Sequence, residues 1–117
     1  MESRFLGKSG LELSVFGFGC MTFSDGTGRF GATGSTSGSD AARQIDLCID
    51  HGVNFFDNAE GYERGLSEVV MGEALNNLNN PRDSYCVSSK VFFGAHENPL
   101  PTQMGLSRKH ITEACHQ

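Results

Sequence analysis

The sequence lacks an excess of basic residues. Its 117 residues include 9 lysines and arginines against 14 aspartates and glutamates, a formal net charge of -5. The densest basic run is only Arg108-Lys109-His110. Nucleic acids and anionic membrane surfaces both require clustered Lys and Arg side chains that displace counterions. The composition therefore disfavours nucleic acid and a membrane surface as partners.

Long hydrophobic runs are missing as well. No stretch approaches the roughly 18 consecutive apolar residues of a membrane-spanning helix. The start, Met1-Glu2-Ser3-Arg4, is not followed by the apolar core of a secretory signal. We therefore expect a cytoplasmic protein with no direct membrane insertion.

The cysteines lack the spacing of a metal site. There are four, with no Cys-x-x-Cys pair and no histidine at zinc-finger distance, so no metal is predicted. Their even number leaves a disulfide framework open, but the absent secretory signal favours reduced thiols. Cys48 and Cys115 fall on apolar helix faces and Cys86 inside an apolar strand, where reduced cysteine behaves as a small hydrophobe.

Strands come first along the chain. Residues 4–6 and 11–13 are separated by a segment with glycines at both ends, which predicts a β-hairpin. The nearly all-apolar run 15–21 predicts a strand buried on both faces, as in a parallel sheet. Residues 24–39 are rich in glycine and serine and predict a long loop.

Helices and strands then alternate. Alternation predicts parallel strands joined by right-handed crossovers, in either a doubly wound sheet or a (β/α)8 barrel. A whole barrel needs about 250 residues, so this chain would supply about three of its units. The predicted elements are a helix capped by Ser39 or Asp40 and ended by Gly52, a strand at 53–57, a helix at 67–78, a strand at 85–90 and a helix capped by Ser107 with Ile111, Ala114 and Cys115 on its apolar face.

Three reactive groups lie at or just beyond strand ends, where α/β folds place their catalysts. Asp57 ends one strand and Lys90 the next, and strands about 4.8 Å apart would let the two form an ion pair. Tyr62 follows in the loop after Asp57. A lysine charge would lower the phenol pKa from about 10, which suits protonation of a carbonyl oxygen while a nicotinamide delivers hydride. A capping aspartate and a solvated lysine are the ordinary alternatives.

A second motif offers an alternative nucleotide-binding site. Gly26, Gly28 and Gly31 form Gly-x-Gly-x-x-Gly after a strand, and Asp50 lies about 20 residues further on, as in a dinucleotide fingerprint. The motif should open a helix directly, yet more loop residues intervene. A flexible rim loop is the alternative.

Several motifs resemble those of the aldo-keto reductases, in the same order and over essentially the whole chain. They are Arg-Phe-Leu-Gly-Lys-Ser-Gly-Leu at 4–11, Gly-Phe-Gly-Cys-Met-Thr-Phe at 17–23, Phe-Asp-Asn-Ala-Glu-Gly-Tyr at 56–62, Gly-Leu-Ser-Glu at 65–68, Gly-Glu-Ala-Leu at 72–75 and Ser-Lys-Val at 89–91. Residues 105–111 resemble the branch that includes the voltage-gated potassium channel beta subunits.

The resemblance implies an α/β fold, the N-terminal portion of a (β/α)8 TIM barrel whose bottom is closed by the hairpin. It implies reduction of aldehydes or ketones with NADPH, with Asp57, Tyr62 and Lys90 as catalytic residues. The cofactor contacts are implied at Gly19, Cys20 and Met21, with Asp57 also near the nicotinamide ribose.

The resemblance also implies that residues 1–117 form a partial domain, truncated before strand four. The family's fourth catalytic position lies on that strand, and none of the four histidines takes its place. The isolated chain is expected to be inactive. A regulatory nicotinamide-binding subunit and an inactive fragment stay open as alternatives to the enzyme. The expected partners are a small carbonyl substrate for the enzyme and either a second copy of the chain, in a homo-oligomer, or a channel. Phe23, Phe92 and Phe93 are candidate walls of the substrate pocket.

Overall fold

The chain opens with an antiparallel hairpin. In a computed structural model, which describes residues 1–26 and 35–117, β1 (Ser3–Phe5) pairs with β2 (Glu12–Ser14). Gly7 and Gly10 both take a positive φ in the connection, of 56° and 76°. These are conformations that glycine adopts without a steric penalty. The predicted hairpin is confirmed, with each strand shifted by one residue.

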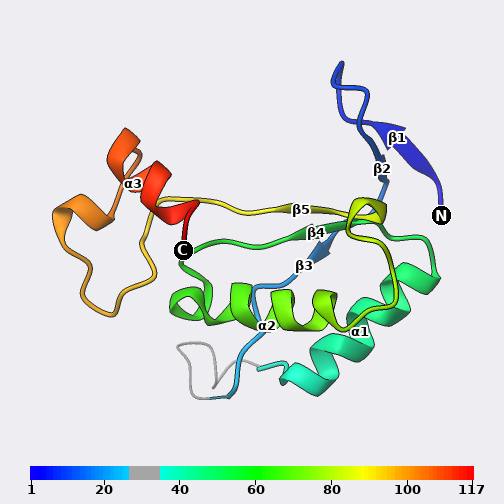
Figure 1. The fold of residues 1–117 in the computed structure, drawn as a ribbon, viewed down its shortest axis with the longest axis horizontal. Helices are drawn as coiled ribbons and strands as arrows, with labels where there is room; N and C mark the ends of the chain where they lie inside the picture. Colours follow the sequence, from blue (N-terminus) through cyan, green and yellow to red (C-terminus); the bar gives the residue numbers. More distant parts are fainter. Residues whose placement is uncertain (27–34) are drawn as a thin grey trace.

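Three parallel strands follow, in the spatial order β3-β4-β5. They are β3 (Phe18–Gly19), β4 (Phe55–Asp57) and β5 (Cys86–Ser88). Their carboxyl ends face the end of the molecule where α3 (Arg108–Ala114) lies, away from the hairpin (Figure 1). The parallel sheet expected from the alternating elements is confirmed.

The first parallel strand is much shorter than predicted. Only two residues of the run 15–21 form β3, and Val15, Phe16 and Met21 are exposed. The prediction of a strand buried on both faces is wrong, because within the described residues helices cover only one face of the sheet (Figure 1), and β3 is also its edge strand, hydrogen-bonded to β4 alone. An apolar run at a sheet edge therefore reaches the surface.

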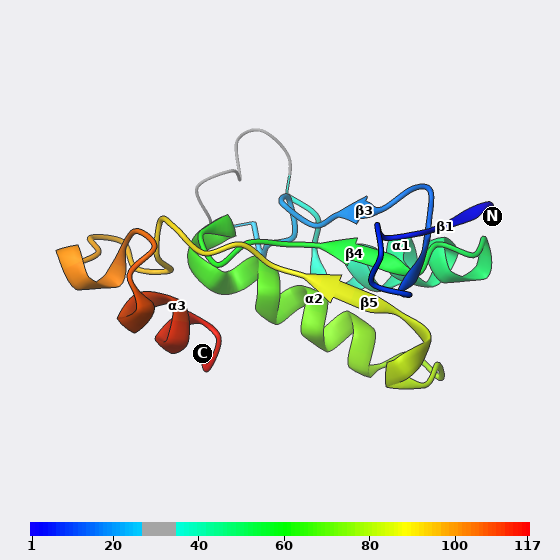
Figure 2. The ribbon, with the colours of Figure 1, turned by 90° about the horizontal axis from the view of Figure 1, so that it is seen from above.

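Two helices cover one face of this sheet. Figures 1 and 2 show α1 (Gly38–Asp50) and α2 (Leu66–Asn76) on the same side of the strands, packed against each other. A doubly wound sheet carries helices on both faces, whereas a barrel carries them all on its outer face. The arrangement favours a barrel segment. Shorter 3-10 turns lie at Tyr62–Gly65, Arg82–Ser84 and Pro101–Gln103.

The hydrophobic core lies between the sheet and these helices. Phe56, at the centre of β4, is completely buried. The apolar stripes predicted for α1 and α2 face it. Their buried members are Ala41 and Ile45 from α1, and Val70, Met71, Ala74 and Leu75 from α2, with Cys20, Phe23 and Tyr85 completing the cluster.

Helix ends follow local capping chemistry. Ser37, not Ser39 or Asp40, caps α1, because its hydroxyl accepts from the amide of Asp40 at 3.5 Å. The chain leaves α1 at Gly52, which has a φ of 81°, as predicted. Ser107 caps α3 as predicted, and its hydroxyl accepts from the amide of His110 at 3.1 Å.

The buried face of α3 differs from the prediction. His110 is buried, whereas Ile111 and Cys115 are exposed. The helix packs against loops and not against the sheet, and His110 contacts a backbone carbonyl in the loop after β5 and the Glu60 carboxyl group in the loop after β4. All four cysteines are free thiols, with Cys20 buried and Cys115 exposed.

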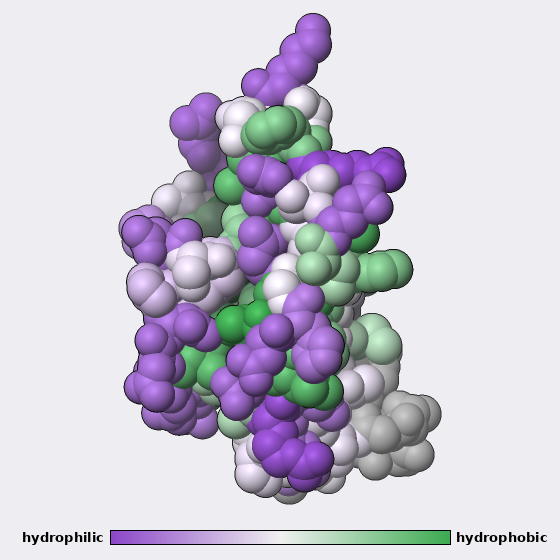
Figure 3. All heavy atoms as spheres, turned by 90° about the vertical axis from the view of Figure 1, so that its right-hand side faces the viewer, coloured by the Kyte–Doolittle hydropathy of each residue, from purple (hydrophilic) through white to green (hydrophobic). Residues whose placement is uncertain are grey.

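Apolar side chains reach the surface at the hairpin end. Phe5 and Phe16 are about two-thirds exposed, at 66% and 67%, and line a groove with Leu6 and Phe55. Figure 3 shows green apolar side chains among purple polar ones on this end. Within residues 1–26 and 35–117, every helix falls short of the length and apolar content of a membrane span.

Replacing the central core residue tests this packing. We expect Phe56→Ala to lower the free energy of unfolding by about 3–5 kcal/mol, because a fully buried ring leaves a cavity. Urea denaturation of the full-length protein would measure it. Leu47→Ala, at a side chain of α1 that is 60% exposed, is the control and should cost less than about 0.5 kcal/mol. Equal effects of the two substitutions would contradict this core.

Candidate functional site

Asp57 and Lys90 form an ion pair at the carboxyl ends of β4 and β5. The Lys90 Nζ atom lies 2.6 Å from Asp57 Oδ2 and 2.6 Å from the carbonyl oxygen of Asn58. On the other carboxylate oxygen, the hydroxyl of Ser88 donates at 2.5 Å. Asp57 and Ser88 are register partners, so the sheet itself sets this contact. The predicted ion pair is present.

Each partner stabilises the charged form of the other. Desolvation pushes the pKa of Asp57 upward, but hydrogen bonds from Lys90 and Ser88 and the lysine charge outweigh it and lower the pKa. Desolvation pushes the pKa of Lys90 downward, but the hydrogen bond and charge of Asp57, with a smaller contribution from Tyr62, raise it. The pair therefore stays charged across the neutral range.

Tyr62 lies beside this pair. The Lys90 Nζ atom is 5.1 Å from the centre of the Tyr62 ring, within the range of a cation–π contact. The turn after Tyr62 is unusual, because Glu63 and Arg64 adopt positive φ values of 48° and 57°. Such conformations cost about 1–3 kcal/mol each in non-glycine residues and occur where surrounding structure enforces them. The three sequence-predicted reactive groups thus converge.

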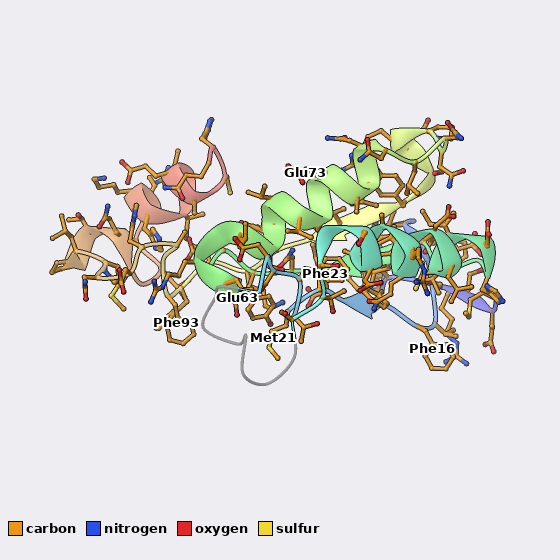
Figure 4. All side chains as sticks on the ribbon, turned by 90° about the horizontal axis from the view of Figure 1, so that it is seen from below. Phe16, Met21, Phe23, Glu63, Glu73 and Phe93 are labelled. Atoms are coloured by element: carbon orange, nitrogen blue, oxygen red, sulfur yellow. The ribbon has the colours of Figure 1, made fainter. Side chains whose placement is uncertain are left out.

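The cofactor contacts that the resemblance implies lie at the end of the neighbouring strand, β3, and just beyond it. Gly19 is the register partner of Asp57, and a Cβ atom added there would meet no atom within 4 Å. Met21 is 43% exposed and lies close to the sheet end in Figure 4. The Cys20 side chain, by contrast, is fully buried. Its thiol faces the core, its amide donates to the carbonyl oxygen of Asp57 at 2.9 Å, and its carbonyl oxygen accepts from the Ser67 hydroxyl at 2.6 Å. Cys20 therefore presents no accessible atom to a ligand, and the expected cofactor contact at this residue is not found.

A buried polar network joins these elements, and sequence reasoning missed it. The Ser67 hydroxyl, at the start of α2, lies 2.6 Å from the Cys20 carbonyl oxygen and 2.9 Å from Asn58 Oδ1. Both Ser67 and Asn58 are fully buried. Buried polar groups require such partners. The network fixes the ends of β3 and β4 against α2.

A cavity of about 430 Å³ opens beside Tyr62 and Lys90. Phe92 and Phe93 form its apolar wall, with ring centres 5.0 Å apart and nearly perpendicular ring planes. The prediction that Phe23 lines the pocket is wrong, because Phe23 is 1% exposed and packs on Phe18 in the core. Figure 4 shows Phe93 projecting at the end of the molecule opposite Phe16. The remaining lining residues are Ala59, Glu60 and Gly61.

Two ionisable residues with no predicted role meet behind this wall. Glu60 and His110 are buried, and their side chains lie 3.2 Å apart. Glu60 lies within the Phe-Asp-Asn-Ala-Glu-Gly-Tyr motif at 56–62, three residues after the strand-end Asp57, but the sequence indicated no role for it.

The structure gives no support to the other candidate sites within the described residues. The competing glycine motif falls largely on residues 27–34, outside the described residues. In the part of the chain that is described, no group of three or more His, Cys, Asp or Glu side chains is arranged to hold a metal ion.

Comparison with known proteins identifies the family. The model of the "Aldo/keto reductase family" matches residues 16–117, most of the chain. The chain belongs to the aldo/keto reductase family. Oxidoreductases make up this family, and its members typically use NAD(P)H.

Curated proteins are also similar to this chain. Two plant proteins named "Probable voltage-gated potassium channel subunit beta" are similar over 114 residues. The one from Arabidopsis thaliana is 41% identical and the one from Oryza sativa subsp. japonica 39% identical. Each match covers 97% of this chain and 31% of the plant protein. The chain therefore spans about a third of the length of these relatives.

A solved structure agrees with the fold. An aldo-keto reductase from Bacillus halodurans, in its holo form, superposes with a TM-score of 0.72 at 30% identity. The match covers 97% of this chain and 34% of that one. The predicted α/β fold is confirmed, and it corresponds to about a third of an aldo-keto reductase TIM barrel.

Removing Lys90 tests the electrostatics of the site. In Lys90→Met we expect the pKa of Asp57 to rise, because desolvation remains while the lysine's hydrogen bond and charge are lost. A ¹³C NMR titration of the carboxyl group would measure it. Lys109→Met, on α3, is the control. An unchanged Asp57 pKa in Lys90→Met would contradict the pairing.

The sign of the pH dependence follows from the same shifts. A lowered Asp57 pKa gives a stabilisation that is lost as the pH falls through that pKa. A raised Lys90 pKa gives one that is lost as the pH rises through it.

Alkylation tests the burial of the Cys20 thiol. Desolvation, with smaller contributions from Asp57 and Cys48 and against that of Lys90, raises the pKa of Cys20 to about 12. Because the thiolate is the nucleophile, we expect Cys20 to resist iodoacetamide at about pH 8 while the exposed Cys115 reacts. Peptide mass spectrometry reads both sites in one sample. Modification of Cys20 as fast as Cys115 would contradict the assignment.

Proposed function

We propose that the protein reduces aldehydes or ketones with NADPH. The observation that carries this proposal is the convergence of Asp57, Lys90 and Tyr62 at the strand ends, beside a cavity with one apolar wall. Membership of an oxidoreductase family supports it independently. Such a site combines a proton donor with space for a small carbonyl compound.

Each residue has a distinct task. Tyr62 donates a proton to the carbonyl oxygen as negative charge develops there. A nearby cation stabilises the negative charge that is left on the phenol oxygen as the proton leaves, which speeds the transfer. Lys90 supplies that charge, 5.1 Å from the ring centre. Asp57 and Ser88 keep the lysine charged and in place.

The strand ends also fit the nicotinamide half of the cofactor. NADPH would supply hydride to the carbonyl carbon. Gly19 offers an open backbone beside Asp57, and Met21 is accessible next to it. Cys20, between Gly19 and Met21 in the sequence, is fully buried. It supports them from the core side, where its carbonyl oxygen accepts from the Ser67 hydroxyl. This chain therefore holds the reacting end of the cofactor at the tips of β3 and β4.

The chain spans about a third of its relatives, so the complete barrel is proposed as the active unit. We expect residues 1–117 alone to be inactive, because three parallel strands leave an uncovered sheet face and unpaired edges. The free thiols suit a reducing compartment, and we place the protein in the cytoplasm.

A regulatory role is the second candidate. The plant relatives are named channel beta subunits, which favours a nicotinamide-binding subunit that associates with a channel. In that case the bound nicotinamide would report redox state and turnover would be incidental. Recovery of an intact channel with the native protein would favour it, and rapid aldehyde turnover would favour the enzyme.

Tyr62→Phe in the full-length protein tests the enzymatic proposal. We expect the rate of carbonyl reduction to fall roughly 100- to 10,000-fold, because the proton donor is lost. The NADPH dissociation constant should change less than about twofold, since the ring remains. Stopped-flow loss of NADPH fluorescence measures the hydride step. Tyr85→Phe, at a buried core tyrosine, is the matched control and should leave the rate unchanged. A Tyr62→Phe protein with most of its hydride-transfer rate would refute the assigned role.

A further inference from the structure

The Glu60 carboxylate is buried where three segments meet. Its side chain is only 6% exposed, between the loop after β4, the loop after β5 and the start of α3. An ionisable group is seldom buried to this degree unless it is paired and hydrogen-bonded. The partners of Glu60 therefore indicate what holds it there.

Both carboxylate oxygens of Glu60 are used. Oε1 accepts from the backbone amide of Phe92 at 2.6 Å and from that of Gly94 at 3.1 Å. Oε2 lies 3.2 Å from Nε2 of His110. One side chain thus spans the two amides that flank Phe93 and a helix that follows in the sequence.

His110 is fixed from its other ring nitrogen. Nδ1 lies 2.8 Å from the carbonyl oxygen of Gly105, and a carbonyl can only accept, so Nδ1 carries a proton. The contact between Nε2 and the Glu60 carboxyl group then requires one further proton between them. Either assignment of that proton gives a pair with no net charge, which suits its burial.

Backbone hydrogen bonds and close contacts also hold the two loops around the pair together. The amide of Glu60 donates to the carbonyl oxygen of Lys90 at 3.0 Å, and the amide of Gly105 donates to that of Phe92 at 2.7 Å. At Gly61 an added Cβ would lie 3.3 Å from Phe93 Cβ. The backbones of the two loops are therefore in direct contact. The segment that carries Phe92 and Phe93 is hydrogen-bonded to the loop after β4 on one side and to Gly105 on the other.

We propose that the Glu60–His110 pair is a positioning device that holds the Phe92–Phe93 wall over the Tyr62–Lys90 cavity. The pair acts through the amides of Phe92 and Gly94 and touches no reacting atom. This inference rests on the proposed carbonyl reductase function. It assigns the pair to the binding of carbonyl compounds with a large apolar group, because only these reach the wall.

Variants at position 60 separate hydrogen bonding from packing. Glu60→Met keeps the approximate size of the side chain but replaces both carboxyl oxygens with a single, weakly accepting sulfur. Glu60→Gln keeps an oxygen for both amides, and its NH₂ group can donate to Nε2 of a neutral His110. Glu73→Met, at an exposed glutamate on α2, is the matched control (Figure 4).

The readout is steady-state kinetics of the full-length protein with benzaldehyde and with propanal. For Glu60→Met we expect the KM for benzaldehyde to rise about tenfold, which corresponds to the loss of roughly one hydrogen bond, with kcat nearly unchanged. The KM for propanal should change little, because propanal is too short to need the wall. Glu60→Gln and Glu73→Met should match the unchanged protein.

Two kinetic results would overturn the proposal. One is an unchanged benzaldehyde KM in Glu60→Met, and the other is an equal rise in KM for both aldehydes. A Glu60→Gln protein as impaired as Glu60→Met would do the same, since it would show that hydrogen-bond acceptance is not what matters.

Amide exchange keeps the test separate from the proposed function. If the unchanged protein reduces neither aldehyde, the proposed function fails and hydrogen exchange at Phe92 and Gly94 decides about the pair. Exchange about tenfold faster in Glu60→Met supports the proposal, and equal rates overturn it. If Glu60→Met does not fold, the unchanged protein decides, because unprotected amides at both positions would overturn the proposal and protected ones support it.

Discussion

The site depends on the placement of β4 between β3 and β5. Phe56 is buried beneath this strand and anchors it to both helices, so the strand cannot shift along its neighbours without exposing the ring. The same register puts Gly19, Asp57 and Ser88 in one row across the sheet. A hydrophobic contact in the core therefore sets the position of the reactive groups at the rim.

Beyond the strand ends, polar side chains do the positioning. Asn58 and Ser67 join the tips of β3 and β4 to α2, and Glu60 joins the loops after β4 and β5 to α3. Because these groups are buried, each lost hydrogen bond leaves an unsatisfied partner, at a cost of about 1–3 kcal/mol. Loops fixed in this way can present Tyr62 and the aromatic wall at a defined distance from Lys90.

The relation to known proteins is consistent with this division. The chain matches about a third of the length of its family relatives, and that third contains the sheet rim with Asp57, Tyr62 and Lys90. An apolar groove lies at the hairpin end, and the described helices α1 and α2 leave the other face of the sheet uncovered (Figure 2).

The sequence by itself determined the order of elements, the stripes of α1 and α2 and the Asp57–Lys90 pair. These follow from periodicity, glycine and serine signals and the geometry of adjacent strands, all of which are local or nearly so. The length of β3, the burial of Phe23 and Cys20 and the contact between Glu60 and His110 were decided only in the tertiary structure. Each depends on contacts between residues that are far apart in the sequence. The local spacing of residues does not predict such contacts.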